Sequence, residues 1–349
     1  NVLPLPCSRS CHGDRGKHSG SGCRTVTTRT DGIRVGSNSE LVIENSEIRL
    51  PHLRGIRVGG NGSIAVRDSD LHTYGIFMDE TAQSSNDAKT LKKLEITNST
   101  VLTGDIIGAR GGYSSVDEVV IHGSSIRLND EYTYNYCTIG GGTNGSFGSI
   151  DIQNSQIHIP SSGGNTAIGN GWQVYYNRES RIRIANSEVS VRCASLGPAI
   201  GAAWDSGSGR INIIIENSTV TAKGGNLRTD GNYVPGIGKN ALGRAPEIGI
   251  QILNSTVDTF RLTEKGGTDY VYDDLHEKNL PGIPPENITI CGSTVNGKTI
   301  DHSFDEYGKC TLCGKYDLGY CYEHGIMMSL MMIFGIWLCA ISHPSFPSA

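Results

Sequence analysis

One short motif occurs nine times along the chain, and it constrains the fold more than any other feature of the sequence. Each copy holds an Asn, Asp or Gly followed directly by Ser, and we call the first residue of this pair the anchor. The anchors are Asn45, Asp68, Asn98, Gly123, Asn154, Asn186, Asn217, Asn254 and Gly292. Aliphatic residues stand four and two positions before each anchor and three positions after it. Self-similarity of this kind indicates a repeat architecture.

The alternation before each anchor predicts a β-strand with one buried face. Around Asn186, for example, Ile182 and Ile184 are two residues apart, which is the side-chain period of a strand. The next aliphatic residue, Val189, comes three positions after the anchor, so one residue is inserted and the chain bends. Asn, Asp and Gly tolerate the left-handed backbone of such a bend. We also expect stacked Asn side chains to form an amide ladder inside the turn.

The distance between copies identifies the kind of repeat. Neighbouring anchors are separated by 23 residues (Asn45 to Asp68) up to 38 residues (Asn254 to Gly292), and no amphipathic helix fits between them. The main rival solenoid, the leucine-rich horseshoe, has an L-x-x-L-x-L spacing that is absent here. A second column of Ile-Gly pairs recurs in step with the anchors, beginning at Ile107, Ile139, Ile168, Ile200 and Ile237. We therefore predict an all-β fold, a single-stranded right-handed parallel β-helix of about nine coils over residues 31–300.

The copies ITNSTV, IENSTV and ILNSTV, with the intervening AIG and GIG, resemble β-helical repeat proteins. These occur among the surface and secreted proteins of anaerobic gut and rumen bacteria. The resemblance covers residues 31–300 and is specific for the fold. Members of this group serve as adhesins, carbohydrate binders and surface proteins of unassigned role. The resemblance therefore implies a secreted or cell-surface location, and it does not define an activity.

Charge and cysteine content exclude two classes of protein. The 30 Lys and Arg against 35 Asp and Glu, with a net charge of -5, provide no basic face for nucleic acid. The 10 cysteines gather mainly near the two ends, unlike the dense framework of a small disulfide-rich domain. Between the ends lie Cys137, Cys193 and Cys291, which we expect to be buried single thiols because Cys packs as a small hydrophobe.

Both ends of the chain depart from the repeat. Residues 1–30 are polar and without periodicity, which predicts an irregular leader. The segment HSFDEYGKCTLCGK resembles a short motif, H-x-F-x3-G-x-C-x2-C-G, at the ends of many such bacterial surface proteins. A nearby Cys-x2-His pair supplies a second half-site, and two such pairs suit a tetrahedral structural Zn²⁺. We predict a zinc-binding knuckle over residues 301–325, with the ligands Cys310, Cys313, Cys321 and His324 and with His302 as a further candidate. A redox pair or a disulfide is the alternative, and Ca²⁺ is not excluded as a second cofactor.

A hydrophobic tail completes the chain at residues 326–349. Residues 326–341 (IMMSLMMIFGIWLCAI) carry no charge, but sixteen residues are short for a membrane helix, which needs about 20. Three interpretations remain open for this tail: a membrane anchor, a cap on the open end of the solenoid, and an artefact of the reading frame. The cap has a physical basis, because the terminal coil of a solenoid must be covered.

Aromatic residues form the best candidate ligand surface. Trp172 and Trp204 each stand four positions after the Ile of an Ile-Gly pair, in consecutive coils. If the coils stack in phase, the two indoles lie one above the other and suit the apolar faces of sugar rings. The alternative is that both indoles wedge under a loop as local core. The other residues of this candidate site are Tyr134, Tyr175, Arg110 and Asp205.

Catalysis remains open because parallel β-helices also host polysaccharide lyases and glycosidases. A glycosidase needs two carboxylates on one face. The weak candidates are Asp79, Glu80, Asp273 and Asp274, none of which matches a known signature, so solvated surface acids are the favoured interpretation. The sequence thus predicts a non-catalytic extracellular protein that binds carbohydrate or a host or cell surface. A polysaccharide-degrading lyase or glycoside hydrolase and a structural spacer are the alternatives.

Overall fold

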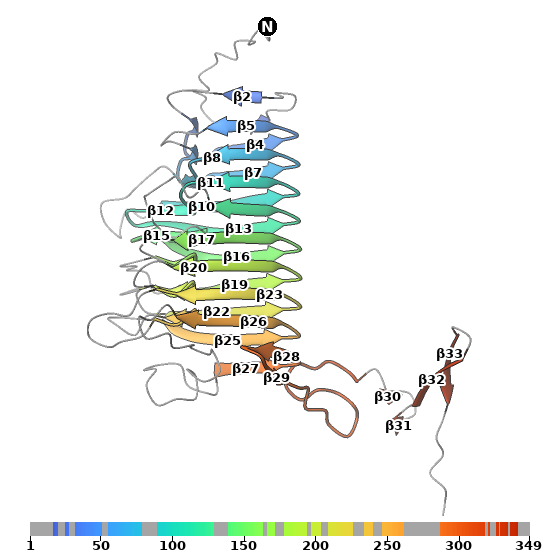
Figure 1. Cartoon of the computed structure of the whole chain (residues 1–349). Helices are drawn as coiled ribbons and strands as arrows, with labels where there is room; N and C mark the ends of the chain where they lie inside the picture. The colour runs from blue at the N-terminus through green and yellow to red at the C-terminus, as the bar shows by residue number, and fades with distance from the viewer. Residues whose placement is uncertain are drawn as a thin grey trace, which may run out of the picture.

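Figure 1 shows the computed structural model of the chain, in which most strands stack into a rod. The structure describes residues 17–19, 25–27, 32–50, 55–78, 89–128, 139–162, 166–171, 178–193, 197–203, 209–225, 234–239, 246–261, 287–317, 320–321, 326–327, 329–333 and 336–340. All regular elements in these ranges are β-strands. None of the described segments is a helix long and apolar enough to cross a membrane.

Each coil contributes strands to three sheets, which we name sheets A, B and C. Sheet A contains β1 (Lys17–Ser19), β4 (Glu40–Glu44), β7 (Ser63–Arg67), β10 (Lys89–Thr97), β13 (Ser114–His122), β16 (Ser146–Gln153), β19 (Arg178–Ala185), β22 (Gly209–Glu216), β25 (Glu247–Leu253) and β27 (Ile288–Cys291). Sheet B contains β2 (Thr25–Thr27), β5 (Glu47–Leu50), β8 (Asp70–Thr73), β11 (Thr100–Thr103), β14 (Ser125–Leu128), β17 (Gln156–Ser162), β20 (Glu188–Cys193), β23 (Thr219–Gly224), β26 (Thr256–Arg261), β28 (Ser293–Val295) and β29 (Lys298–Ile300). Sheet C contains β3 (Ile33–Val35), β6 (Ile56–Val58), β9 (Ile76–Met78), β12 (Ile107–Gly111), β15 (Ile139–Thr143), β18 (Ile168–Asn170), β21 (Ile200–Ala202) and β24 (Ile237–Lys239).

Strands of one sheet follow one another in chain order and pair in parallel, with the exception of β29. The register aligns the repeat copies residue by residue, so that Ile152 pairs with Ile184 and Ile184 with Ile215. The anchors adopt the left-handed backbone, as at Asn186 with a φ of 49°. The prediction of a right-handed parallel β-helix is therefore confirmed (Figure 1).

The predicted inward columns form the core of the rod. The aliphatic residues two before and three after each anchor are buried in every copy, and those four before are buried in all but the last, where Ile288 is partly buried. They belong to a single hydrophobic cluster that runs through the described coils. Full burial of each such side chain contributes about 1.5–3 kcal/mol before the entropy of folding is subtracted.

The ladder inside the turn differs from the prediction, because serine and not asparagine forms it. The Ser187 hydroxyl accepts a hydrogen bond from the Ser155 backbone N–H at 3.1 Å and donates one to the Ala185 carbonyl at 2.6 Å. The same N–H to Oγ bond links the turn serines of successive coils from Ser46 to Ser293. The Asn and Asp anchors are exposed, as at Asn186, with the exception of Asn254, which is partly exposed. The left-handed anchor therefore bends the backbone, and the hydroxyl of the buried serine makes hydrogen bonds with the backbone N–H and C=O groups of the turn.

The connections that flank sheet C vary in length from coil to coil. From the first copy to the eighth, the connection between sheets A and B contains only the anchor and its Ser. The connection from sheet C to sheet A spans residues 112–113 in one coil and 171–177 in another. From sheet B to sheet C it spans residues 74–75 in one coil and 225–236 in another. A surface that differs from coil to coil therefore belongs to the sheet C side of the rod.

The two ends of the chain also contain strands. Within the range 1–30, where the sequence predicts an irregular leader, β1 and β2 pair in parallel with β4 and β5. Within the hydrophobic tail, β32 (Ser329–Ile333) and β33 (Ile336–Ala340) form an antiparallel pair. Upstream, β30 (Tyr320–Cys321) pairs with β31 (Ile326–Met327). The choice between membrane anchor, cap and artefact stays open.

Candidate metal centre

Four potential metal ligands converge at the C-terminal end of the rod: Cys291, His302, Cys310 and Cys313. Cys291 is the last residue of β27, the final strand of sheet A. His302 follows β29 by two residues, and the two other cysteines belong to the segment 301–317, which we call the ligand loop. The ligand atoms of the four residues lie within 4.8 Å of one another.

A tight hairpin returns the chain to Cys291. Asn296 and Gly297 join β28 to β29 with φ values of 48° and 78°, the positive pair that a two-residue hairpin turn requires. Strand β29 then runs antiparallel to β28, with Ser293 opposite Ile300. His302 therefore emerges beside the residues that precede β28.

The last anchor is Gly292, and a larger residue there would displace His302. A Cβ atom on this glycine would lie 2.2 Å from Nε2 of His302, and its φ is 56°. The eighth anchor, by contrast, is Asn254, whose side chain accepts a hydrogen bond at 3.2 Å from Nζ of Lys315 in the ligand loop. The end of the repeat thus makes room for the histidine and fastens the loop to the preceding coil.

Short turns shape the ligand loop. Oδ1 of Asp305 accepts the backbone N–H of Lys309 at 2.9 Å. The Gly314 N–H donates to the Cys310 carbonyl at 2.8 Å, and the Cys310 N–H donates to the Lys315 carbonyl at 2.7 Å. These bonds close a turn around the Cys-x2-Cys-Gly sequence, so both sulfurs face the same point.

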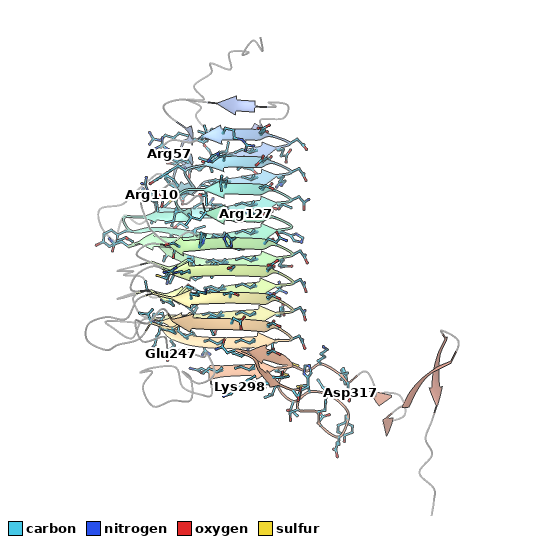
Figure 2. The ribbon with its side chains drawn as sticks, in the orientation of Figure 1. Arg57, Arg110, Arg127, Glu247, Lys298 and Asp317 are labelled. Atoms are coloured by element: carbon cyan, nitrogen blue, oxygen red, sulfur yellow. The ribbon has the colours of Figure 1, made fainter. Side chains whose placement is uncertain are left out.

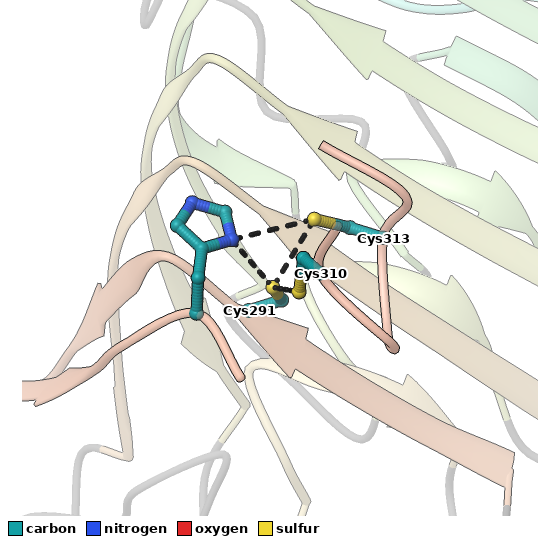
Figure 3. A group of neighbouring side chains, drawn as sticks. Cys291, Cys310 and Cys313 are labelled. Carbon is teal, nitrogen blue, oxygen red and sulfur yellow. Dashed lines mark hydrogen bonds between the residues drawn. The ribbon is translucent and has the colours of Figure 1, made fainter. Parts of the chain in front are cut away.

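The sulfur atoms and the imidazole are in direct contact (Figure 3). Sγ of Cys291 lies 3.2 Å from Sγ of Cys310, 3.2 Å from Sγ of Cys313 and 3.0 Å from Nδ1 of His302. The Cys313 sulfur is also 3.4 Å from that nitrogen. Cys291 and Cys310 are buried, whereas Cys313 is partly exposed.

Contact between the sulfurs drives the pKa values of two of the thiols apart. Burial raises the pKa of Cys310, but hydrogen bonds from the backbone N–H of Cys313, from Cys291 and from the backbone N–H of Leu312 lower it to about 5. Burial, together with the hydrogen bonds to Cys310 and Cys313, raises the pKa of Cys291 well above its ordinary value. If all three sulfurs were ionised they would repel one another, and a cation bound between them would offset that repulsion. The donor set can therefore hold a metal ion.

Part of this cluster is predictable from the sequence. Cys310 and Cys313 are predicted ligands and His302 is a further candidate, and the structure brings these three together. The side chain of Cys321 and all of His324 lie outside the described residues, so their role stays a prediction. Cys291 was expected to be a buried single thiol. It is buried, but beside the other ligands, and the signal that could have revealed it is a cysteine directly before a glycine anchor.

Arg110 is the one residue of the predicted sugar site that the structure describes, and it lies on the N-terminal half of the rod (Figure 2). Its Nε is 3.4 Å from Oδ2 of Asp105, and its guanidinium carbon is 5.6 Å and 5.1 Å from the ring centroids of Tyr74 and Phe77. It therefore has partners within its own part of the rod. The other candidates lie outside the described residues: Trp172, Trp204, Asp205, Tyr134, Tyr175, Asp79, Glu80, Asp273 and Asp274.

Comparisons of the chain with known protein families, with characterised proteins and with solved structures gave no match. The site must therefore be interpreted from its own chemistry.

Proposed function

We propose that this protein is a non-catalytic β-helical scaffold whose last coil is closed by one structural Zn²⁺. The observation that carries the proposal is the convergence of Cys291, His302, Cys310 and Cys313 within 4.8 Å. Three thiolates and one imidazole match the Cys3His set that Zn²⁺ takes in structural sites. Four protein donors fill its tetrahedral coordination and leave no position for a substrate, which supports a structural role.

Hydrogen bonds close the turns of the ligand loop, but most of its large apolar side chains are not buried. All the exposed large hydrophobic residues in the described part of the chain belong to this loop: Phe304, Tyr307, Leu312 and Tyr316. Its apolar side chains are thus only partly withdrawn from water, and the loop lacks a core of its own. Segments of this size are commonly stabilised by a metal ion, whose binding free energy then becomes folding free energy.

The position of the site suggests what the metal does for the rod. Strand β27 is the last of sheet A, and an edge strand exposes unpaired backbone groups that invite association with other chains. A metal bound to Cys291 would fasten the ligand loop against this end. Figure 2 places Lys298 and Asp317 at the same end of the rod. The proposed function of the metal is therefore to close the terminal coil, as solenoids require.

Zinc analysis of the purified full chain and of single variants tests this proposal. We expect equimolar zinc in the wild-type protein and in Cys193→Ser, a matched control at a buried cysteine outside the cluster. We expect loss of zinc in Cys291→Ser. Wild-type protein without zinc would contradict the proposal. So would full zinc in Cys291→Ser together with its loss in Cys321→Ser, because the ligands would then be the set predicted from the sequence.

We also propose that the sheet C side of the rod binds carbohydrate or a host or cell surface outside the cell. It is favoured by the pairing of β18 with β21, in which Asn170 is opposite Ala202. In the sequence, Trp172 and Trp204 each come two positions after one of these paired residues. Strands in a sheet are about 4.8 Å apart, which suits two rings serving one glycan chain.

Incubation with a panel of polysaccharides tests this second proposal. Retention on insoluble glycan, lost in the double variant Trp172→Ala and Trp204→Ala, is the expected result. Retention that is unchanged in the double variant would contradict the proposed site. New reducing ends or unsaturated sugars would instead indicate a glycoside hydrolase or a lyase, and absence of both binding and turnover would favour a spacer.

A further inference from the structure

Cys291 and Cys313 are the pair of metal ligands that joins the rod to the ligand loop. Cys291 belongs to β27, and Cys313 lies 22 positions further along the chain with its sulfur 3.2 Å away. Both are free thiols. A disulfide bond is about 2.05 Å long, so the sulfurs need to approach by roughly an ångström to be joined.

The three thiols differ in their exposure to solvent. Cys313 is partly exposed, whereas Cys291 and Cys310 are buried with 0% and 1% of their surface accessible. An oxidant from solvent therefore meets Cys313 first, since access to the oxidant limits the oxidation of a buried thiol. The Cys310 sulfur accepts hydrogen bonds from the backbone N–H groups of Leu312 and Cys313, which hold it inside its own turn. Cys291 has no such bonds within its strand among the described contacts, and its sulfur touches the other two.

We propose that Cys313 is a peroxide-sensitive residue and that its oxidation yields a Cys291–Cys313 disulfide, which replaces the metal as the fastening of the rod's end. This inference rests on the proposed zinc site and adds a second closed form to it. The oxidant is a hydroperoxide, and hydrogen peroxide is the simplest member of that class.

The chemistry balances in two steps. The Cys313 thiolate attacks one peroxide oxygen, the O–O bond breaks, and the products are a sulfenic acid on Cys313 and hydroxide. The Cys291 thiol then attacks the Cys313 sulfur and gives up its proton, the S–S bond forms, and the sulfenic oxygen leaves as water. One further proton converts the hydroxide of the first step to water, so the two sulfurs together lose two electrons and the peroxide gains two. A Zn²⁺ held by the four residues would lose two of its ligands to the disulfide and would be released.

The redox conditions around the protein therefore determine whether a metal ion or a disulfide joins the ligand loop to the rod. In reducing, zinc-containing conditions the metal joins Cys291 to the loop. In oxidising conditions, such as those outside cells, the disulfide makes the same connection without metal. Since both fastenings join the same two points, the terminal coil stays closed in either state.

The test is to treat the zinc-loaded full chain with hydrogen peroxide and follow zinc release with a metal-sensitive dye. The thiols are then alkylated and the peptides are mapped without reduction. We expect equimolar zinc release together with one disulfide between Cys291 and Cys313. The Cys310→Ser variant should form the same disulfide, whereas Cys291→Ser should not form any disulfide with Cys313.

A disulfide between Cys310 and Cys313, a sulfinic acid on Cys313 without a disulfide, or unchanged thiols would each overturn the inference. Hydrogen exchange gives a second readout that does not depend on the variants: amides of β27 and β28 should stay protected after oxidation, and loss of their protection would also overturn it. If the wild-type chain carries no zinc, the proposed function fails separately. The same peptide mapping on the metal-free reduced chain then decides whether the disulfide forms.

Discussion

Replacing Asp105 by Asn should change how the stability of the rod depends on pH. Asp105 lies between β11 and β12, and its side chain is fully buried. Its charged partner is Arg110, whose Nε is 3.4 Å away and whose side chain is 40% exposed. The desolvation cost of ionising this buried carboxylate exceeds the stabilisation that the charge of one partly exposed guanidinium provides.

The size of the effect follows from the pKa of Asp105, which burial raises from 3.8 to about 6 although the charge of Arg110 lowers it. A carboxyl whose pKa rises on folding binds its proton more tightly in the native state. Its contribution to stability is therefore present at low pH and is lost as the pH rises from 3.8 to about 6. Two pKa units correspond to about 3 kcal/mol, so at pH 7 the ionised Asp105 should cost the native state an amount of that order.

Urea unfolding of wild type and Asp105→Asn at several pH values measures this. Because Asn does not titrate, the unfolding free energy of the variant minus that of wild type should increase by about 3 kcal/mol between pH 3.5 and pH 7. The matched control is Asp258→Asn, a substitution of an exposed aspartate on β26. Its unfolding free energy relative to wild type should change little over the same pH range. A difference that stays constant or falls with rising pH for Asp105→Asn would refute the reasoning.

Two further substitutions probe the turns. Ser187→Ala leaves the buried N–H of Ser155 without its acceptor and should cost about 1–3 kcal/mol, visible as faster hydrogen exchange at Ser155; unchanged exchange would show that the serine ladder contributes nothing. Gly292→Ala places a Cβ 2.2 Å from the histidine ligand and should weaken zinc binding at least tenfold, whereas Gly297→Ala has a similar positive φ and no atom within 4 Å. Equal zinc affinity in the two glycine variants would contradict the role assigned to Gly292.

The repeat predicted the fold because each coil meets nearly the same surroundings. The period-two aliphatic positions and the bend after the anchor are local properties, and stacking multiplies them, as the pairing of Ile152, Ile184 and Ile215 shows. The ladder was assigned to the wrong residue because sequence spacing does not show which of two adjacent polar side chains turns inward. The left-handed anchor directs its own side chain to solvent, and Ser187 is therefore the one inside.

The metal centre is only partly predictable, because two of its four ligands reach the others only through the tertiary structure. Cys310 and Cys313 share one turn, so their spacing alone places two sulfurs together. Cys291 and His302 reach that point only because the β28–β29 hairpin reverses the chain at Asn296, and this contact depends on tertiary structure. The sequence alone instead favours the nearest Cys-x2-His pair further along the chain, Cys321 and His324.

Hydrogen exchange with and without zinc tests the central claim most directly. The claim is that a metal at Cys291, His302, Cys310 and Cys313 closes the last coil, so removal of the ion from the reduced full chain with a chelator should open that coil first. We expect amides of β27, β28 and β29 to lose protection by tenfold or more, while those of β13 in the middle of the rod keep theirs. Equal protection of β27–β29 in the zinc-loaded and chelated proteins would contradict the account.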